Sequence, residues 1–125
     1  MSTQTDAVQE DGVPFRLLHV GVNCSTSEEA DQLTSLYCSM LGMKPSENPA
    51  SYFVGSSIEV MKSPYLGTHG HMAYGVPNME KALDFLSQRG FLPDMGTAVY
   101  NEEGKLAVVY LKGEFGGFAI HLKLI

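Results

Sequence analysis

The feature that most constrains the fold is an internal repeat. The stretches LLHVGVNC (17–24) and GTHGHMAYGV (67–76) each place a histidine, His19 and His71, at the start of a β-like run. Two further pairs of stretches match in the same order, at a helix end and in a closing strand: LGMKP (41–45) with RGFLP (89–93), and GSSIEV (55–60) with GFAIHL (117–122). Three matched pairs in one shared order predict that a structural unit occurs twice in the chain.

Each copy has the pattern of a βαβββ unit. Amphipathic spacing and capping residues predict helices that begin after Ser25–Ser27 and after Asn78, and that end at Gly42 and Gly90. The apolar residues expected to form the buried face of the first helix are Ala30, Leu33, Leu36, Tyr37, Met40 and Leu41. The predicted strands are 17–23, 50–54, 57–62, 71–76, 97–101, 105–112 and 117–124. The fold class is therefore α+β.

Length and composition predict one domain. A chain of 125 residues suits a single core, and we assign residues 15–125 to it, with module one at 15–63 and module two at 69–125. Residues 1–14 are polar and acidic without periodicity, so we expect a disordered tail. The sequence shows no secretory signal, and Cys24 and Cys38 lack metal-site spacing, which is typical of reduced thiols in a cytoplasmic protein.

Charge and hydropathy exclude two classes of partner. The net charge of −6 argues against nucleic acid or an anionic membrane as the main partner, because both require a basic face. No apolar run approaches the roughly 18–20 residues of a membrane span. A small-molecule ligand is the remaining expectation.

Strand alternation brings four polar side chains to one face of the sheet. Residues two apart on a strand point the same way, so His19, Gly21 and Asn23 share a face and Leu18, Val20 and Val22 face the helix. The same parity places Glu59, His71 and His121 on the face that carries no helix. If the two modules pair about a pseudo-twofold axis, the side chains at matched positions converge on one centre: His19, Glu59, His71 and His121.

Three imidazoles and one carboxylate form a ligand set for a divalent transition metal: zinc, iron(II), manganese, cobalt or nickel. Small residues beside them, namely Gly21, Ser57, Ala73 and Ala119, leave room for an ion and a ligand. The alternative is a fold that retains these side chains for hydrogen bonding without a metal.

With these residues in place, the chain resembles the vicinal oxygen chelate superfamily, which includes glyoxalase I, extradiol dioxygenases, methylmalonyl-coenzyme A epimerase and bleomycin resistance proteins. The resemblance covers about residues 15–125. It implies the glyoxalase/bleomycin resistance/dihydroxybiphenyl dioxygenase-like fold, in which two βαβββ modules form a cupped mixed sheet around a metal. It also implies ligands on the first and last strand of each module, which correspond here to His19, Glu59, His71 and His121.

The sequence departs from that superfamily at the last ligand, where the usual glutamate of a G-N-x-I-E-L-like stretch is replaced by His121 of GFAIHL. This argues against glyoxalase I and extradiol dioxygenase activity. The runs VMKSPYLGTHGHMAYGV and AVVYLKGEFGGFAIHL are similar to a chelate-type domain associated with bacterial keto-deoxy-phosphogluconate (hydroxy-oxoglutarate) aldolases. The chain is too short to contain the aldolase barrel itself.

Two kinds of function follow. The first is a metal-dependent isomerase, epimerase or lyase that acts on a small 2-oxo or 2-hydroxy acid or a related carbonyl compound, with Glu59 and His121 as catalytic residues and His69 as an alternative base. The second is a non-catalytic binding protein or an accessory domain linked to the aldolase. The residues expected to contact the small-molecule substrate are Asn23, Ser57, His69 and Lys123. We expect a homodimer, with modules that pair either within one chain or between two.

Overall fold

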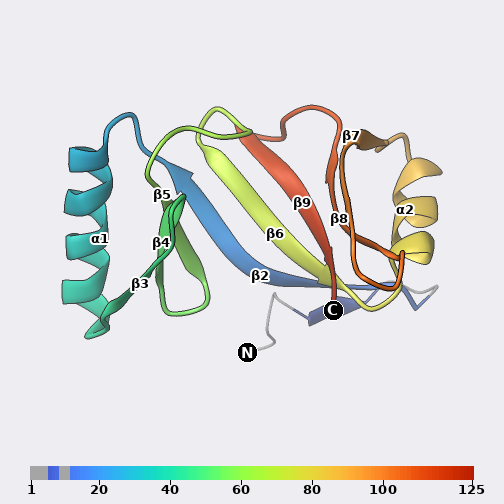
Figure 1. Ribbon diagram of the computed structural model, residues 1–125. Helices are drawn as coiled ribbons and strands as arrows, with labels where there is room; N and C mark the ends of the chain where they lie inside the picture. Colours follow the sequence, from blue (N-terminus) through green and yellow to red (C-terminus); the bar gives the residue numbers. More distant parts are fainter. Residues whose placement is uncertain (1–5, 9–11) are drawn as a thin grey trace.

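The two predicted modules form one continuous mixed sheet with a helix at each end (Figure 1). The computed structural model describes residues 6–8 and 12–125. Module one contains β2 (Pro14–Asn23), α1 (Ser27–Leu41), β3 (Pro45–Glu47), β4 (Ser51–Val54) and β5 (Ile58–Met61). Module two contains β6 (Gly70–Val76), α2 (Met79–Ser87), β7 (Pro93–Tyr100), β8 (Leu106–Leu111) and β9 (Phe118–Leu124).

The strand order is β3-β4-β5-β2-β6-β9-β8-β7, which places the first strands of the two modules side by side at the centre. β2 and β6 pair antiparallel, whereas β5 lies parallel to β2 and β9 lies parallel to β6. The modules therefore pair within one chain. The predicted α+β fold of two βαβββ units is confirmed.

Capping residues fix where the helices begin. Thr26 accepts a hydrogen bond from the backbone N–H of Glu29 at the start of α1, and Asn78 accepts one from Lys81 at the start of α2. α1 ends at Gly42, whose φ of 65° is the left-handed conformation that glycine adopts most easily. α2 ends three residues before the predicted Gly90. The chain there closes a tighter turn, in which the N–H groups of Arg89 and Gly90 bond to Leu86 and Ser87.

Each helix packs on one face of the strands of its own module and covers a small hydrophobic core there. Under α1 the core consists of Cys24, Ala30 and Val60, with Leu33 and Tyr37 packed against it. Under α2 the buried residues are Val13, Val76, Met79, Ala82, Val109, Leu111 and Leu122. The opposite face of the sheet carries His19, Glu59, His71 and His121. Both cysteines are free thiols.

The predicted apolar face of α1 is partly wrong. Ala30, Leu33 and Tyr37 pack against the sheet as expected, but Leu36, Met40 and Leu41 are exposed. The helix turns Thr34 rather than Leu36 toward the core. An apolar period identifies a helix, but it does not say which part of a wide apolar face the sheet will cover.

Two short strands were absent from the predicted elements. β3 is exposed throughout and begins with a proline, so it carries no apolar alternation. β1 (Asp6–Val8) pairs antiparallel with β2 inside the segment predicted as a disordered tail, and Pro14 already belongs to β2. The rest of that prediction, at residues 1–5 and 9–11, lies outside the described residues.

A β-bulge in β2 changes which side chains face the open side of the sheet. The register with β6 shifts between Leu17 and His19, so Leu18 is an extra residue. Arg16 therefore pairs with Gly75 and shares a face with His19, although simple alternation places it on the helix side. Leu18 also reaches this face, because its Cδ2 would lie 3.1 Å from a Cβ at Gly75. The predicted orientation of Leu18 is wrong for this reason.

No helix among the described residues is long and apolar enough to cross a bilayer.

Candidate metal centre

The four predicted ligands lie on four adjacent strands of the sheet. In spatial order, Glu59 is on β5, His19 on β2, His71 on β6 and His121 on β9. The register alternates these large side chains with small ones: Gly21 pairs with both Glu59 and His71, and Ala73 pairs with both His19 and His121. The small residues leave the space in which the imidazoles meet.

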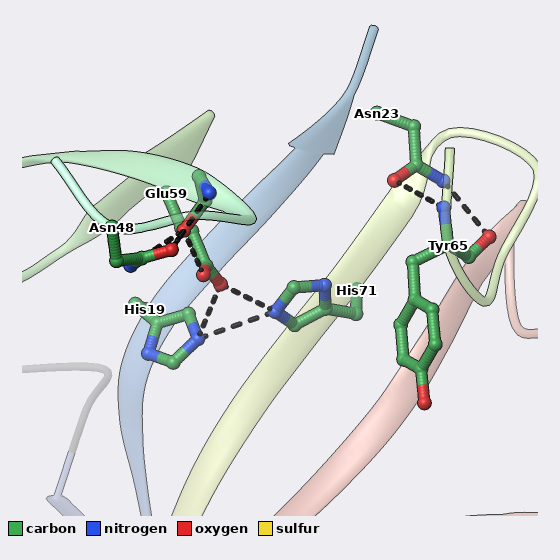
Figure 2. Close-up of polar contacts among 7 residues, drawn as sticks. His19, Asn23, Asn48, Glu59, Tyr65 and His71 are labelled. Atoms are coloured by element: carbon green, nitrogen blue, oxygen red, sulfur yellow. Dashed lines mark hydrogen bonds and ion pairs between the residues drawn. The ribbon is translucent and has the colours of Figure 1, made fainter. Parts of the chain in front are cut away.

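The side chains of His19, Glu59 and His71 converge at hydrogen-bond distances (Figure 2). His19 Nε2 lies 3.2 Å from His71 Nε2. Glu59 Oε1 lies 3.4 Å from His19 Nε2 and 3.1 Å from His71 Nε2. One nitrogen from each of His19, His71 and His121 lies within 4.8 Å of the other two. Glu59 does not belong to that group of three. Its carboxylate approaches the three imidazoles from the side of His19 and His71.

Glycine is required opposite His71. A Cβ built on Gly21 would lie 2.1 Å from His71 Cε1 and 2.6 Å from His71 Nε2, inside the van der Waals radius of the ring. His71 is 3% exposed. Its imidazole packs against the backbone of Gly21, which has no side chain. The glycine of the H-V-G-V stretch thus makes room for the histidine of the other module.

Glu59 is held at both carboxylate oxygens. Ser51 Oγ donates to Glu59 Oε2 at 2.6 Å, while Oε1 faces the two histidines. Asn48 in turn holds Ser51, because its Oδ1 accepts from the N–H groups of Ala50 and Ser51 at 2.8 Å and its Nδ2 donates to Ser51 Oγ at 3.1 Å. Ser51 is fully buried. This network fixes the rotamer of Glu59 before any ligand binds.

The surroundings keep Glu59 ionised. Burial raises the pKa of its carboxyl, but hydrogen bonds from His19, His71 and Ser51 together outweigh burial and hold the pKa well below the ordinary value. The centre therefore contains one carboxylate at neutral pH.

His121 is a neutral imidazole without a hydrogen-bond partner in residues 6–8 and 12–125. Burial, and then the charges of His71, His19 and Lys123, lower the pKa of His121 to about 4. Both of its ring nitrogens are buried and make no hydrogen bond with the described residues, and the same is true of His71 Nδ1. Buried polar atoms are almost always paired, so an imidazole that is left without a protein partner inside a cluster of three histidines is what a metal site requires. The residues present therefore fit a divalent metal.

The ring of Tyr110 holds His121 in its orientation. The two rings stack with centroids 4.7 Å apart and an interplanar angle of 17°. Tyr110 and His121 are direct partners between β8 and β9. Ligating histidines usually take their orientation from a hydrogen bond at the second nitrogen. At His121 the stacked ring of Tyr110 takes the place of such a hydrogen bond in orienting the imidazole.

The predicted substrate contacts divide into two groups. Ser57 and Lys123 line a cavity of about 630 Å³ beside His19. Asn23 instead braces the loop between β5 and β6: its Nδ2 donates to Tyr65 O and its Oδ1 accepts from Tyr65 N–H (Figure 2). The same Nδ2 also donates to Gly67 O. His69 is exposed, and its ring packs over Gly117 and near Phe118.

Sequence reasoning missed three residues of the site. Arg16 reaches it only through the bulge, and Tyr110, which stacks on His121, is not among the predicted site residues. Ser51 carried no signal of its own, although it pairs with Met61 on the strand that bears Glu59. Side-chain hydrogen bonds between neighbouring strands depend on register, which the sequence pattern fixes only where one face is apolar.

Solved structures with the same fold include methylmalonyl-CoA epimerases. The methylmalonyl-CoA epimerase from Mycobacterium tuberculosis superposes with a TM-score of 0.54 at 18% identity, over 99% of this chain and 91% of that one. Hypothetical protein BH1468 from Bacillus halodurans C-125 gives 0.58 at 18% identity, over 89% and 94%. The chain has the glyoxalase-like fold.

A third structure, a methylmalonyl-CoA epimerase in complex with methylmalonyl-CoA and NH4+, gives a TM-score of 0.53 at 14% identity, over 86% of this chain and 92% of that one. No protein-family model and no curated protein matches the sequence. At these identities the comparisons establish the fold alone.

Proposed function

We propose that the chain is a metal-dependent enzyme of the glyoxalase-like superfamily that acts on a small 2-oxo or 2-hydroxy acid or a related carbonyl compound, by isomerase, epimerase or lyase chemistry. The observation that carries this proposal is the convergence of three imidazoles and one ionised carboxylate from four strands, with buried ring nitrogens that have no partner in the described part of the chain.

In this proposal His19, His71 and His121 hold the ion, and Glu59 completes or borders the set. A bound divalent cation would supply Lewis-acid stabilisation to two neighbouring oxygens of the substrate. Nitrogen-rich sites suit zinc, cobalt, nickel and iron better than the oxygen-preferring magnesium or calcium. Manganese stays in the predicted group because one ligand is a carboxylate.

The proposed catalytic residues are Glu59 and His121. The Glu59 carboxylate is ionised, and its Oε1 contacts the Nε2 atoms of His19 and His71, so Oε1 is the proposed acceptor of a proton from the carbon next to a carbonyl. His121 keeps its neutral form and its place under Tyr110. Ser57 and Lys123 lie where the remainder of a substrate would extend from His19. Asn23 and His69 are retained as predicted substrate contacts.

Epimerase chemistry is supported by analogy. Structures with this fold are named methylmalonyl-CoA epimerases, and one of them contains methylmalonyl-CoA. An epimerase removes and returns a proton at a carbon beside a carbonyl, which is the step that Glu59 can serve. The proposed membership of the vicinal oxygen chelate superfamily has the same support.

One observation favours a second candidate, a binding protein without turnover. β9 contributes His121 rather than a carboxylate, and Glu59 is already engaged at both oxygens. A centre with a single, firmly held carboxylate can bind a chelating ligand without moving a proton. The accessory role linked to an aldolase, the homodimer and the cytoplasmic location remain predictions.

A proton-exchange experiment separates the two candidates. The protein is purified without chelator, its metal content is measured, and it is then incubated in D2O with a panel of 2-oxo acids after loading with zinc, cobalt, nickel, manganese or iron(II). The enzyme predicts deuterium incorporation beside the carbonyl, visible by proton NMR, which Glu59→Gln abolishes while metal content is kept. Ligand binding without exchange under every metal would support the binding protein, and absence of metal binding would refute both metal-based readings.

A further inference from the structure

Tyr110 carries a hydroxyl that no residue in the described part of the chain uses. The residue is only 7% exposed, and its backbone N–H donates to Thr97 Oγ1. Its phenolic oxygen makes no hydrogen bond with residues 6–8 or 12–125, yet it is not one of the sealed polar atoms that lack a partner. A buried tyrosine usually gives its hydroxyl a partner. This hydroxyl is therefore open to a ligand, and its position decides which one.

Tyr110 lies on the opposite side of the three imidazoles from Glu59. The strands run in the order β5, β2, β6, β9 and β8 across the sheet, with Glu59 on the first and Tyr110 on the last. Tyr110 and His121 are paired between β8 and β9, and their rings are nearly parallel. A tyrosine side chain is longer than a histidine side chain, so its hydroxyl stands farther from the sheet than the ring nitrogens. A ligand that lies over the imidazoles would have the carboxylate on one side and the phenol on the other.

The ring of Tyr110 is held from two further directions. The register between β7 and β8 is irregular, and Thr97 stabilises it: its hydroxyl accepts from the Tyr110 N–H at 2.9 Å and donates to Asp94 O at 2.7 Å. The ring of Tyr65 meets the Tyr110 ring edge-on, with 6.1 Å between the centroids and an interplanar angle of 69°. Tyr65 belongs to the β5–β6 loop that Asn23 braces (Figure 2). The phenol is thus positioned before a ligand binds, which is what an effective hydrogen-bond donor at a reacting centre requires.

We propose that the Tyr110 hydroxyl is a substrate contact, which donates a hydrogen bond to an oxygen at the chelating end of the ligand. A phenol keeps its proton at neutral pH, so it acts as the donor toward a carboxylate, carbonyl or enolate oxygen. In the proposed reaction Glu59 accepts the proton from the carbon beside the carbonyl and later returns it. Tyr110 keeps its own proton and stabilises the negative charge that forms on the oxygen. The reaction part of this inference rests on the proposed function, whereas the contact with a bound ligand requires no turnover.

Tyr110→Phe removes the hydroxyl and keeps the ring that stacks on His121. Titration calorimetry with oxalate on the zinc-loaded protein measures the contact, because oxalate has two vicinal oxygens and no proton to exchange at carbon. A hydrogen bond to a charged group is worth about a tenfold change in affinity or more. We expect the oxalate Kd to rise by that factor in the variant, with the zinc affinity and the melting temperature unchanged. Tyr100→Phe, at an exposed tyrosine on the edge strand β7, is the matched control and should bind oxalate like the wild type.

Proton exchange tests the same hydroxyl during the reaction. With pyruvate at saturating concentration in D2O, Tyr110→Phe should lower the rate constant of deuterium incorporation about tenfold or more, because the donor stabilises charge that appears only in the transition state. A residue that only orients His121 would change the zinc affinity instead, and the phenylalanine ring preserves that role. Equal oxalate Kd values and equal exchange rates in the wild type and Tyr110→Phe would overturn the inference.

A label on tyrosine separates this inference from the proposed function. In protein that contains 3-fluorotyrosine, fluorine NMR follows the Tyr110 resonance, which is assigned by its absence from Tyr110→Phe. A saturable shift of this resonance with oxalate, and none at Tyr100, supports the contact even where no substrate exchanges deuterium. Exchange at the wild-type rate in Tyr110→Phe, without such a shift, supports the proposed function and refutes the contact. If the protein retains no zinc, oxalate is titrated into the metal-free protein, and the lack of a saturable shift there also refutes the inference.

Discussion

Replacing Gly21 by alanine tests the geometry of the centre at its tightest point. The added Cβ would lie 2.1–2.6 Å from three atoms of the His71 ring, and atoms this close must move apart. Gly21 does not have a positive φ, so the backbone accepts alanine there, and a strand glycine replaced by alanine would otherwise gain about 0.5 kcal/mol. Overpacking of a buried site costs about 1–3 kcal/mol. The expected net loss is therefore about 1–2 kcal/mol of unfolding free energy.

The same substitution should disable metal binding, because His71 cannot keep its place beside His19 and Glu59. Loss of groups that only orient a ligand costs about 10–100-fold in metal affinity, so displacement of a ligand itself should cost at least about 100-fold. Calorimetric titration with zinc and urea denaturation measure the two effects. Gly96→Ala is the matched control, because Gly96 also lacks a positive φ and its added Cβ would meet only Asp94 Oδ1, at 3.2 Å.

A double-mutant cycle identifies the cause of the loss. In a His71→Ala background the clash is gone, so Gly21→Ala should no longer destabilise the protein, and the coupling between the two positions should equal most of the 1–2 kcal/mol. Wild-type zinc affinity and an unchanged urea midpoint in Gly21→Ala would refute the packing of His71 against Gly21 and, with it, the arrangement of the centre.

Three further predictions concern the surroundings of the ligands. Ser51→Ala removes the donor to Glu59 Oε2, and we expect zinc affinity to fall about 10–100-fold in calorimetry, whereas unchanged affinity would show that Ser51 does not position Glu59. Tyr110→Leu removes the ring stacked on His121 and should weaken zinc binding about tenfold, while Tyr110→Phe keeps the ring and should bind like the wild type; equal losses in both would contradict the stacking role. Chelator treatment should lower the melting temperature by about 10 °C relative to protein in zinc at 100 times its Kd, since such saturation contributes about 2.7 kcal/mol, and identical melting curves would argue against a site in the folded state.

The repeat made the centre predictable. Once His19 and His71 are placed at equivalent positions of two modules, alternation carries Glu59 and His121 to the same face, and the antiparallel pairing of β2 with β6 brings all four together. The prediction needed only the two-residue period of strands and the symmetry of a duplicated unit.

The other residues of the site depend on features that follow neither from the two-residue period of the strands nor from the symmetry of the duplicated unit. One inserted residue, Leu18, reverses the face of everything before it in β2, so Arg16 joins the site against the simple alternation. Ser51 and Asn48 act through side-chain hydrogen bonds in a turn. The face of α1 that meets the sheet was misjudged because Leu36, Met40 and Leu41 widen its apolar side without being buried.

The presence of His121 rather than a carboxylate on β9 sets the charge of the centre. Three neutral imidazoles and one carboxylate leave one positive charge when a divalent cation binds, whereas a set with two carboxylates would leave none. That residual positive charge lies in a chain whose net charge is −6, and it favours an anionic ligand at the centre. If a second carboxylate were introduced by His121→Glu, zinc should still bind, but the affinity for 2-oxo acids should fall.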